Sequence, residues 1–148
     1  GGWESQKGTL ITDYHVSPSL WGTSGHQIGR VGVIGHETGH FLKLPDLYDT
    51  DGSGAGLGYF GLMANSWGFD GSQLHPPQMS AWSKLQLGWT QPKTPSVGVE
   101  NRVAQSEVKA TAEAPHQLYK VGDDEYGFPP GEYFLIEFRK TSWLEGGI

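Results

Sequence analysis

The chain has 148 residues, no cysteine, and 16 Asp and Glu against 10 Lys and Arg, so its net charge is −6. An acidic chain without a basic stripe is a poor partner for nucleic acid, and no apolar run is long enough to cross a bilayer. Because thiols are absent, any bound metal must be held by imidazole and carboxylate groups.

The first part of the chain predicts one strand and one helix. Residues 10–16 are mostly β-branched and aromatic, and a Ser-Pro-Ser turn follows them, which is typical of a strand. From residue 30 to about 43 the apolar residues fall at helical spacing, and Pro45 disfavours helical geometry at the residue before it. We therefore expect a helix over about 30–43.

The later part predicts a long loop, a second helix and short strands. Glycines are too dense over 49–72 for regular structure, except briefly around 59–63. Two prolines and Gly88 bracket a second helix at about 77–87. Short β-like runs follow, of which 132–139 is the most convincing strand. The predicted fold class is therefore α+β.

An H-E-x-x-H pattern within the first helix carries the chemistry. His36 and His40 are four residues apart, so both imidazoles face one point, which suits Zn²⁺. Glu37 then directs its carboxylate beside a water on that metal. A catalytic zinc takes three protein ligands, and Asp46, just past the helix stop, can return to the same metal through a tight reversal. The alternative is a pair of ordinary surface histidines.

Several stretches resemble one family. Residues 36–49, HETGHFLKLPDLYD, resemble the active-site segment of the immune-inhibitor-A family of secreted bacterial metallopeptidases, which have a metzincin-like architecture. Residues 61–68, GLMANSWG, resemble the family's Met-turn, residues 75–89 the helix that follows it, and residues 132–140 a later strand. The similarity covers about residues 10–92 well and the strand loosely.

The resemblance implies a secreted zinc-dependent endopeptidase that hydrolyses peptide bonds in an extracellular protein or peptide substrate. It implies that the zinc ligands are His36, His40 and Asp46. Glu37 is then the general base that assists attack by the zinc-bound water, and Met63 is the side chain beneath the metal. The plain alternative for Met63 is a flexible filler of the core.

Two positions depart from the family pattern. Lys43 stands where the family usually has a glycine that turns the chain out of the helix; a left-handed conformation there costs about 1–2 kcal/mol relative to glycine. Asn65 stands where some metzincins have a tyrosine after the Met-turn. The group that stabilises the oxyanion is therefore open among Tyr48, Tyr59 and a backbone amide.

Other polar residues have two interpretations each. Asp49 and Asp51 lie on a glycine-rich loop whose oxygens could hold Ca²⁺. Their spacing does not match an EF-hand, and we favour a solvated acidic turn. His75 precedes the second helix, and we interpret it as a surface residue rather than as part of a substrate groove.

We divide the chain at residue 92, into a zinc-peptidase catalytic segment over 1–92 and a β-rich continuation over 93–148. In metzincin-like folds, sheet strands precede the active-site helix, so we hypothesise that this chain is part of a longer peptidase domain, cut near both ends. A second function class is a non-catalytic extracellular binding module, or an inactive fragment, with a structural zinc. Glu37 favours the enzyme, since a structural site needs no base.

Overall fold

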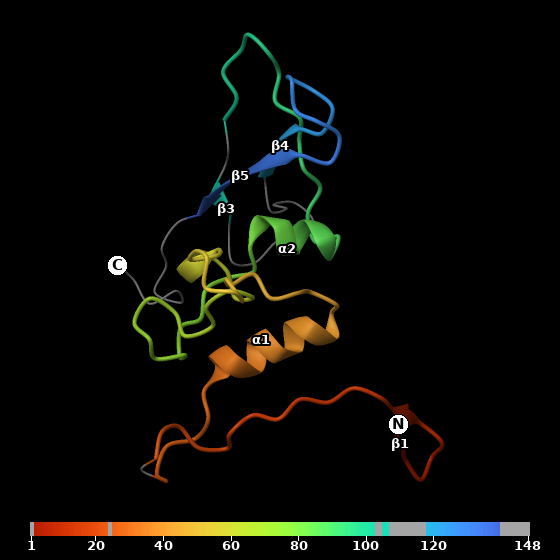
Figure 1. Ribbon diagram of the computed structural model, residues 1–148, viewed down its shortest axis with the longest axis vertical. Helices are drawn as coiled ribbons and strands as arrows, with labels where there is room; N and C mark the ends of the chain where they lie inside the picture. Colours follow the sequence, from red (N-terminus) through yellow and green to blue (C-terminus); the bar gives the residue numbers. More distant parts are fainter. Residues whose placement is uncertain (1, 24, 103–104, 107–117, 140–148) are drawn as a thin grey trace.

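The computed structural model describes residues 2–23, 25–102, 105–106 and 118–139. Helix α1 (Val31–Phe41) lies between the extended N-terminal segment and a loop region that leads to helix α2 (Ala81–Gln86) (Figure 1). The larger sheet lies beyond α2, at the opposite end of the molecule from the N-terminal segment. The mixture of short helices and small sheets agrees with the predicted α+β class.

The described strands form two small sheets. The strand β1 (Trp3–Glu4) pairs with β2 (Leu10–Ile11) in an antiparallel hairpin. In the second sheet, β5 (Tyr133–Arg139) is central: β4 (Leu118–Gly122) pairs with it antiparallel, and β3 (Gln105–Ser106) pairs with it parallel. The strand predicted over 132–139 is therefore confirmed.

The strand predicted over 10–16 is wrong beyond Ile11. Residues 12–16 belong to no strand, and no strand in the described part of the chain pairs with them. Tyr14 and Val16 are 81% and 83% exposed. A β-branched and aromatic composition does not suffice, because a strand is stable only when neighbouring strands bond to it.

Both helices are shorter than predicted, and α2 differs the more. It begins at Ala81 rather than near 77, because the Ser80 hydroxyl caps it by accepting the backbone N–H of Ser83 at 3.0 Å. The preceding residues 77–79 are not helical, and the carbonyl of Gln78 accepts the backbone N–H of Leu62 instead. The brief regular structure expected around 59–63 is the 3₁₀ turn η1 (Gly58–Phe60).

One part of the apolar core lies between α1 and the loop that carries Met63, whose side chain is fully buried, and another surrounds Leu118 of β4. A Cβ on Gly39 would lie 2.3 Å from the Met63 sulfur, and one on Gly32 would lie 2.1 Å from the Ser66 carbonyl oxygen. Glycine at both positions therefore lets the loop approach α1 more closely than any side chain permits. Among the described residues, no helix has the length and apolar character needed to cross a membrane.

Candidate metal centre

Helix α1 depends on a distant loop for its N-terminal hydrogen bonds. Arg30, at the N-cap, provides no side-chain cap. Instead, the backbone N–H of Gly32 donates to the Gln73 carbonyl at 3.0 Å, and that of Val33 donates to the Gln73 side-chain oxygen at 3.2 Å. Arg30 adds a bond of 2.6 Å to the Ser72 carbonyl. The start of α1 is therefore tied to residues 72–73.

The end of α1 is a tight reversal built on a lysine. Lys43 has φ 66°, so it adopts the left-handed conformation that the sequence analysis considered. Its backbone N–H donates to the His40 carbonyl at 2.9 Å, and that of Leu44 donates to the Gly39 carbonyl at 3.2 Å. This pair of bonds is a Schellman motif. It turns the chain sharply back under the helix, toward Asp46.

The structure brings together the three residues that the sequence analysis chose as metal ligands. The Nε2 atoms of His36 and His40 lie 3.0 Å and 3.3 Å from one oxygen, Oδ1, of Asp46. The two imidazole rings are 4.9 Å apart between centroids and nearly perpendicular. One potential ligand atom from each residue lies within 4.8 Å of the others, a spacing compatible with a single ion.

The hydrogen bonds behind the imidazoles decide which of their atoms face the centre. Nδ1 of His36 lies 2.9 Å from the Leu62 carbonyl oxygen, and Nδ1 of His40 lies 2.9 Å from that of Leu44. A carbonyl only accepts, so each Nδ1 donates its proton away from the centre and the Nε2 of each ring is the atom that faces Asp46. Oδ1 of Asp46 is buried and has no hydrogen-bond donor among the described residues.

Three potential ligand atoms therefore converge on one point. Two imidazole nitrogens with one carboxylate oxygen are a donor set that suits Zn²⁺. The residues present fit a divalent metal.

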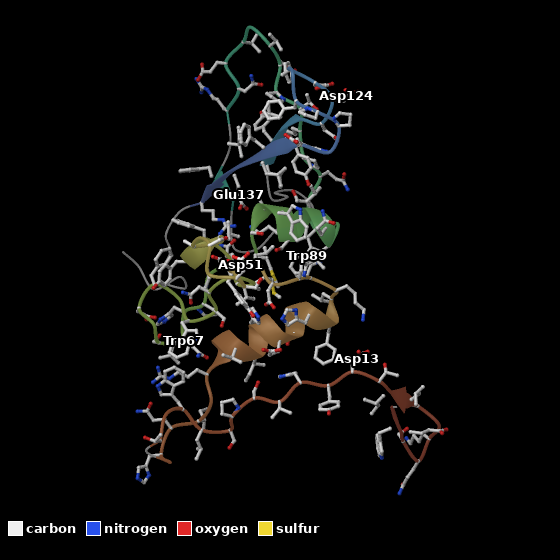
Figure 2. The ribbon with its side chains drawn as sticks, viewed as in Figure 1. Asp13, Asp51, Trp67, Trp89, Asp124 and Glu137 are labelled. Carbon is white, nitrogen blue, oxygen red and sulfur yellow. The ribbon has the colours of Figure 1, made fainter. Side chains whose placement is uncertain are left out.

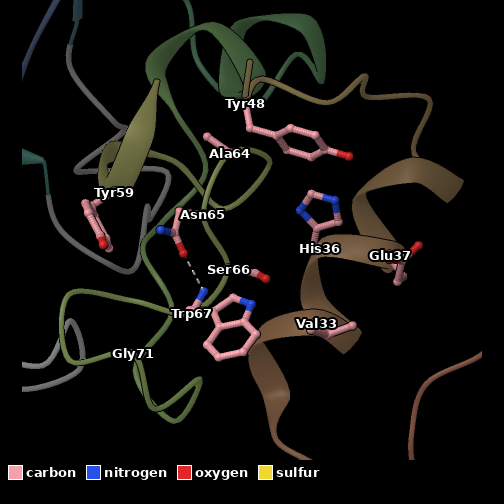
Figure 3. Close-up of a pocket in the computed structure, with 10 residues that line it drawn as sticks. All are labelled: Val33, His36, Glu37, Tyr48, Tyr59, Ala64, Asn65, Ser66, Trp67 and Gly71. Carbon is pink, nitrogen blue, oxygen red and sulfur yellow. Dashed lines mark hydrogen bonds between the residues drawn. The ribbon is translucent and has the colours of Figure 1, made fainter. Parts of the chain in front are cut away.

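Two cavities border the centre. One, of about 550 Å³, lies between α1 and the loop over 64–71 and is lined by residues that include His36, Glu37 and Tyr48 (Figure 3). The second, of about 240 Å³, lies between α1 and residues 12–15, and Glu37 and His40 line it. Glu37 thus faces open space on both sides, where a substrate can reach it.

The sequence of this chain is similar to those of known peptidases. The model of the family described as immune inhibitor A peptidase M6, catalytic domain, matches residues 6–91. The chain belongs to this family. It is also similar to the pre-pro-metalloprotease PrtV of Vibrio cholerae serotype O1, in strains M66-2 and ATCC 39315 (El Tor Inaba N16961). Each comparison gives 41% identity over 59 residues.

Those 59 residues are 38% of this chain but only 6% of each PrtV protein, so the match spans a small part of these relatives. No solved structure matches. Membership of the family makes the chain a partial peptidase M6 domain, and a metallopeptidase acts on peptide bonds with a bound metal.

Tyr48 contacts two of the three candidate metal ligands, His36 and Asp46. Its ring stacks on that of His36, with centroids 6.2 Å apart and planes inclined by 25°. The hydrogen bond to Asp46 and the negative charge of that carboxylate raise the pKa of Tyr48, and burial and Glu37 add to the shift. Tyr59 also lines the larger cavity, but its ring stacks on Phe69 at 5.6 Å.

The loop at Asp49 and Asp51 has the geometry of an acidic turn. One Asp49 oxygen accepts the backbone N–H groups of Asp51 and Gly52 at 3.0 Å and 3.1 Å, and the other accepts that of Gly54. The Ser53 side chain and amide, which bond to Asp51, lower the pKa of that carboxyl. These oxygens already face amide protons, so the geometry gives calcium no support.

His75 pairs with Asp70, its Nδ1 lying 3.3 Å from a carboxylate oxygen, and both side chains are more than a third exposed. It does not line the larger cavity, in agreement with its interpretation as a surface residue. Hydrogen bonds from Ser72 lower the pKa of Asp70 to about 2, and His75 adds to the shift.

Sequence reasoning missed Gln73 and the two carbonyls that orient the imidazoles. Leu44 carried a usable signal, since it lies four residues after His40 across the helix end. Gln73 lies 40 residues after Val33, whose backbone N–H donates to the Gln73 side chain, and Leu62 lies 26 residues after His36. No local pattern marks such pairs.

Proposed function

We propose that this chain is the zinc-binding part of a secreted endopeptidase with metzincin-like architecture, and that His36, His40 and Asp46 hold the zinc. The observation that carries the proposal is the convergence of the Nε2 atoms of His36 and His40 with Oδ1 of Asp46 on one point. Membership of the peptidase M6 family supports it independently. Met63, buried against Gly39, is the supporting side chain beneath the site.

Glu37 is the general base of the proposed reaction. When bound, zinc polarises the substrate carbonyl and lowers the pKa of a coordinated water. Glu37 accepts a proton from the attacking water as the carbon–oxygen bond forms. It then delivers that proton to the amide nitrogen as the carbon–nitrogen bond breaks, so that the products are a carboxylic acid and an amine.

Tyr48 is the tyrosine that we assign to the developing oxyanion. It stacks on His36 and borders the larger cavity, whereas Tyr59 is packed against Phe69. Its raised pKa keeps the hydroxyl protonated at neutral pH, so it remains a hydrogen-bond donor.

We further propose that residues 1–92 form the catalytic segment of a longer peptidase domain and that residues 93–148 are a β-rich continuation of it. The 6% coverage of the PrtV proteins supports a longer parent chain. The exposed apolar side chains between residues 10 and 16 are compatible with additional strands beside them. Secretion follows from the family resemblance, and the substrate is a protein or peptide.

The test uses the full chain with zinc analysis and casein cleavage. We expect one bound zinc per chain in the wild type and in Glu37→Gln, and none in Asp46→Asn. Cleavage should fall about 10²- to 10⁴-fold in Glu37→Gln, the usual contribution of a general base. Equal cleavage by the wild type and Glu37→Gln would rule out this mechanism. Zinc binding without cleavage by the wild type would favour the inactive fragment or binding module.

A further inference from the structure

Three charged side chains are packed where α2, β5 and the loop before Met63 meet. The side chains of Lys84 and Glu137 are only 3% and 5% exposed, and Lys84 Nζ lies 2.5 Å from Glu137 Oε1. Arg139 Nε lies 2.7 Å from the other oxygen of Glu137. We call Lys84, Glu137 and Arg139 the basic–acidic cluster; Figure 2 labels Glu137 above α2.

The charges in the cluster compensate one another. Burial by itself raises the pKa of Glu137, but the hydrogen bond from Lys84 and the charge of Arg139 outweigh it, so the net pKa is lowered. Glu137 is therefore a carboxylate that bridges two cations. Buried ion pairs seldom add much net stability, so stabilisation of the fold is not a sufficient role for this one.

The guanidinium of Arg139 joins two backbone segments. Its Nη1 donates to the Phe60 carbonyl at 2.8 Å, and its Nη2 donates to the Met79 carbonyl at 3.0 Å. The same two segments also bond directly, because the backbone N–H of Leu62 donates to the Gln78 carbonyl at 3.0 Å. Arg139, held in place through its Nε by Glu137, thus restrains the backbone just before Leu62.

Leu62 is the residue that orients a proposed metal ligand. Its carbonyl oxygen lies 2.9 Å from His36 Nδ1, and a single residue, Gly61, separates Leu62 from the Arg139 contact at Phe60. Its side chain also packs on α1, 3.5 Å from where a Cβ on Gly35 would lie. Hydrogen bonds and a short stretch of backbone therefore connect β5 to the imidazole without a gap.

We infer that Arg139, anchored by Glu137 and Lys84, is a positioning residue that fixes the Leu62 carbonyl and through it the ring of His36. The zinc part of this inference rests on the proposed function, whereas the ring orientation does not require a metal. Arg139 lies outside the segment over 6–91 that matches the family, so the metal centre depends on a residue beyond that segment.

The experiment compares Arg139→Gln and Arg139→Lys in the full chain. Glutamine removes both the positive charge and the forked set of guanidinium N–H donors. Lysine keeps the charge, but its single ammonium group cannot bond the Phe60 and Met79 carbonyls in the same geometry. Arg102→Gln is the matched control, because the Arg102 side chain is 85% exposed and, among the described contacts, bonds to the exposed Glu100 alone.

Two measurements are made on each protein. The first is the NMR signal of the His36 Nδ1–H proton in the zinc-free protein, assigned with His36→Asn. The second is zinc affinity from competition with a chelator. We expect Arg139→Gln to lose or shift the signal and to bind zinc about 10-fold more weakly, the low end for residues behind a metal ligand. Arg139→Lys should fall between it and the wild type, and Arg102→Gln should match the wild type.

An unchanged His36 signal and unchanged zinc affinity in Arg139→Gln would overturn the inference, even if the variant melted at a lower temperature. Should Arg139→Gln fail to fold, Glu137→Gln replaces it, with an expected affinity loss of about 3-fold and the same signal shift. If the wild type binds no zinc, the metal proposal fails, and the His36 signal alone decides the role of Arg139.

Discussion

Replacing Lys43 with glycine should stabilise the protein. Lys43 has φ 66° in the Schellman turn that ends α1, and a non-glycine residue in this conformation is strained by about 1–2 kcal/mol. Glycine also gains more conformational freedom in the unfolded chain, and this entropy offsets about 0.5–1 kcal/mol of the strain that is relieved. The net gain is about 0.5–1 kcal/mol, or roughly 1–4 °C in Tm for a chain of this length. The Lys43 side chain is exposed, so few contacts are lost.

The assay is thermal unfolding of the zinc-free proteins by calorimetry. Lys43→Ala is the control: it removes the side chain but keeps the backbone strain, so its Tm should stay within about 1–2 °C of wild type. Lys43→Val should melt lower than both, because a β-branched residue tolerates φ > 0 poorly. A Tm for Lys43→Gly equal to or below that of Lys43→Ala would refute the strained turn.

Three further outcomes are expected. Gln73→Ala should lower the free energy of unfolding by about 1–2 kcal/mol in chemical denaturation, because the amide of Val33 loses its cap. Tyr48→Phe should lower kcat for a peptide substrate about 100-fold with little change in KM, the loss expected for one oxyanion donor. Tyr59→Phe is the control, and a loss of kcat in Tyr59→Phe equal to that in Tyr48→Phe would contradict the assignment. Asp70 has a pKa lowered to about 2, so the stability that its charge contributes is present above its unfolded pKa of about 4 and is lost as the pH falls toward 2. The Tm difference between wild type and Asp70→Asn should therefore shrink over that range, and a difference that is constant with pH would count against this.

The parts of the site that sequence analysis predicted are local. Two histidines four residues apart on a helix must share a face, and the stop at Pro45 leaves only a short path to Asp46. The structure brings these three side chains together because their separation is set by one helix turn and one reversal. The same locality explains why the helix ends were nearly correct for α1.

The parts that were missed depend on partners far along the chain. The start of α2 is displaced to Ala81 because residues 78 and 79 bond to the Met63 loop and to Arg139. The segment over 12–16 has strand composition but no neighbouring strand in the described structure. Periodicity identifies which residues favour a strand or helix, but it holds no information about which segments meet.

The cap at Gln73 has a consequence for the order of events during biosynthesis. An 11-residue helix is too short to persist alone in water, and the acceptor for two of its first amides is translated some 40 residues after it. A nascent chain that has left the ribosome only as far as Asp46 already contains every proposed ligand, yet it lacks Gln73, which accepts the first amides of the helix. Helix α1, with His36 and His40, is therefore completed only after residues 72 and 73 have emerged and packed against its first turn.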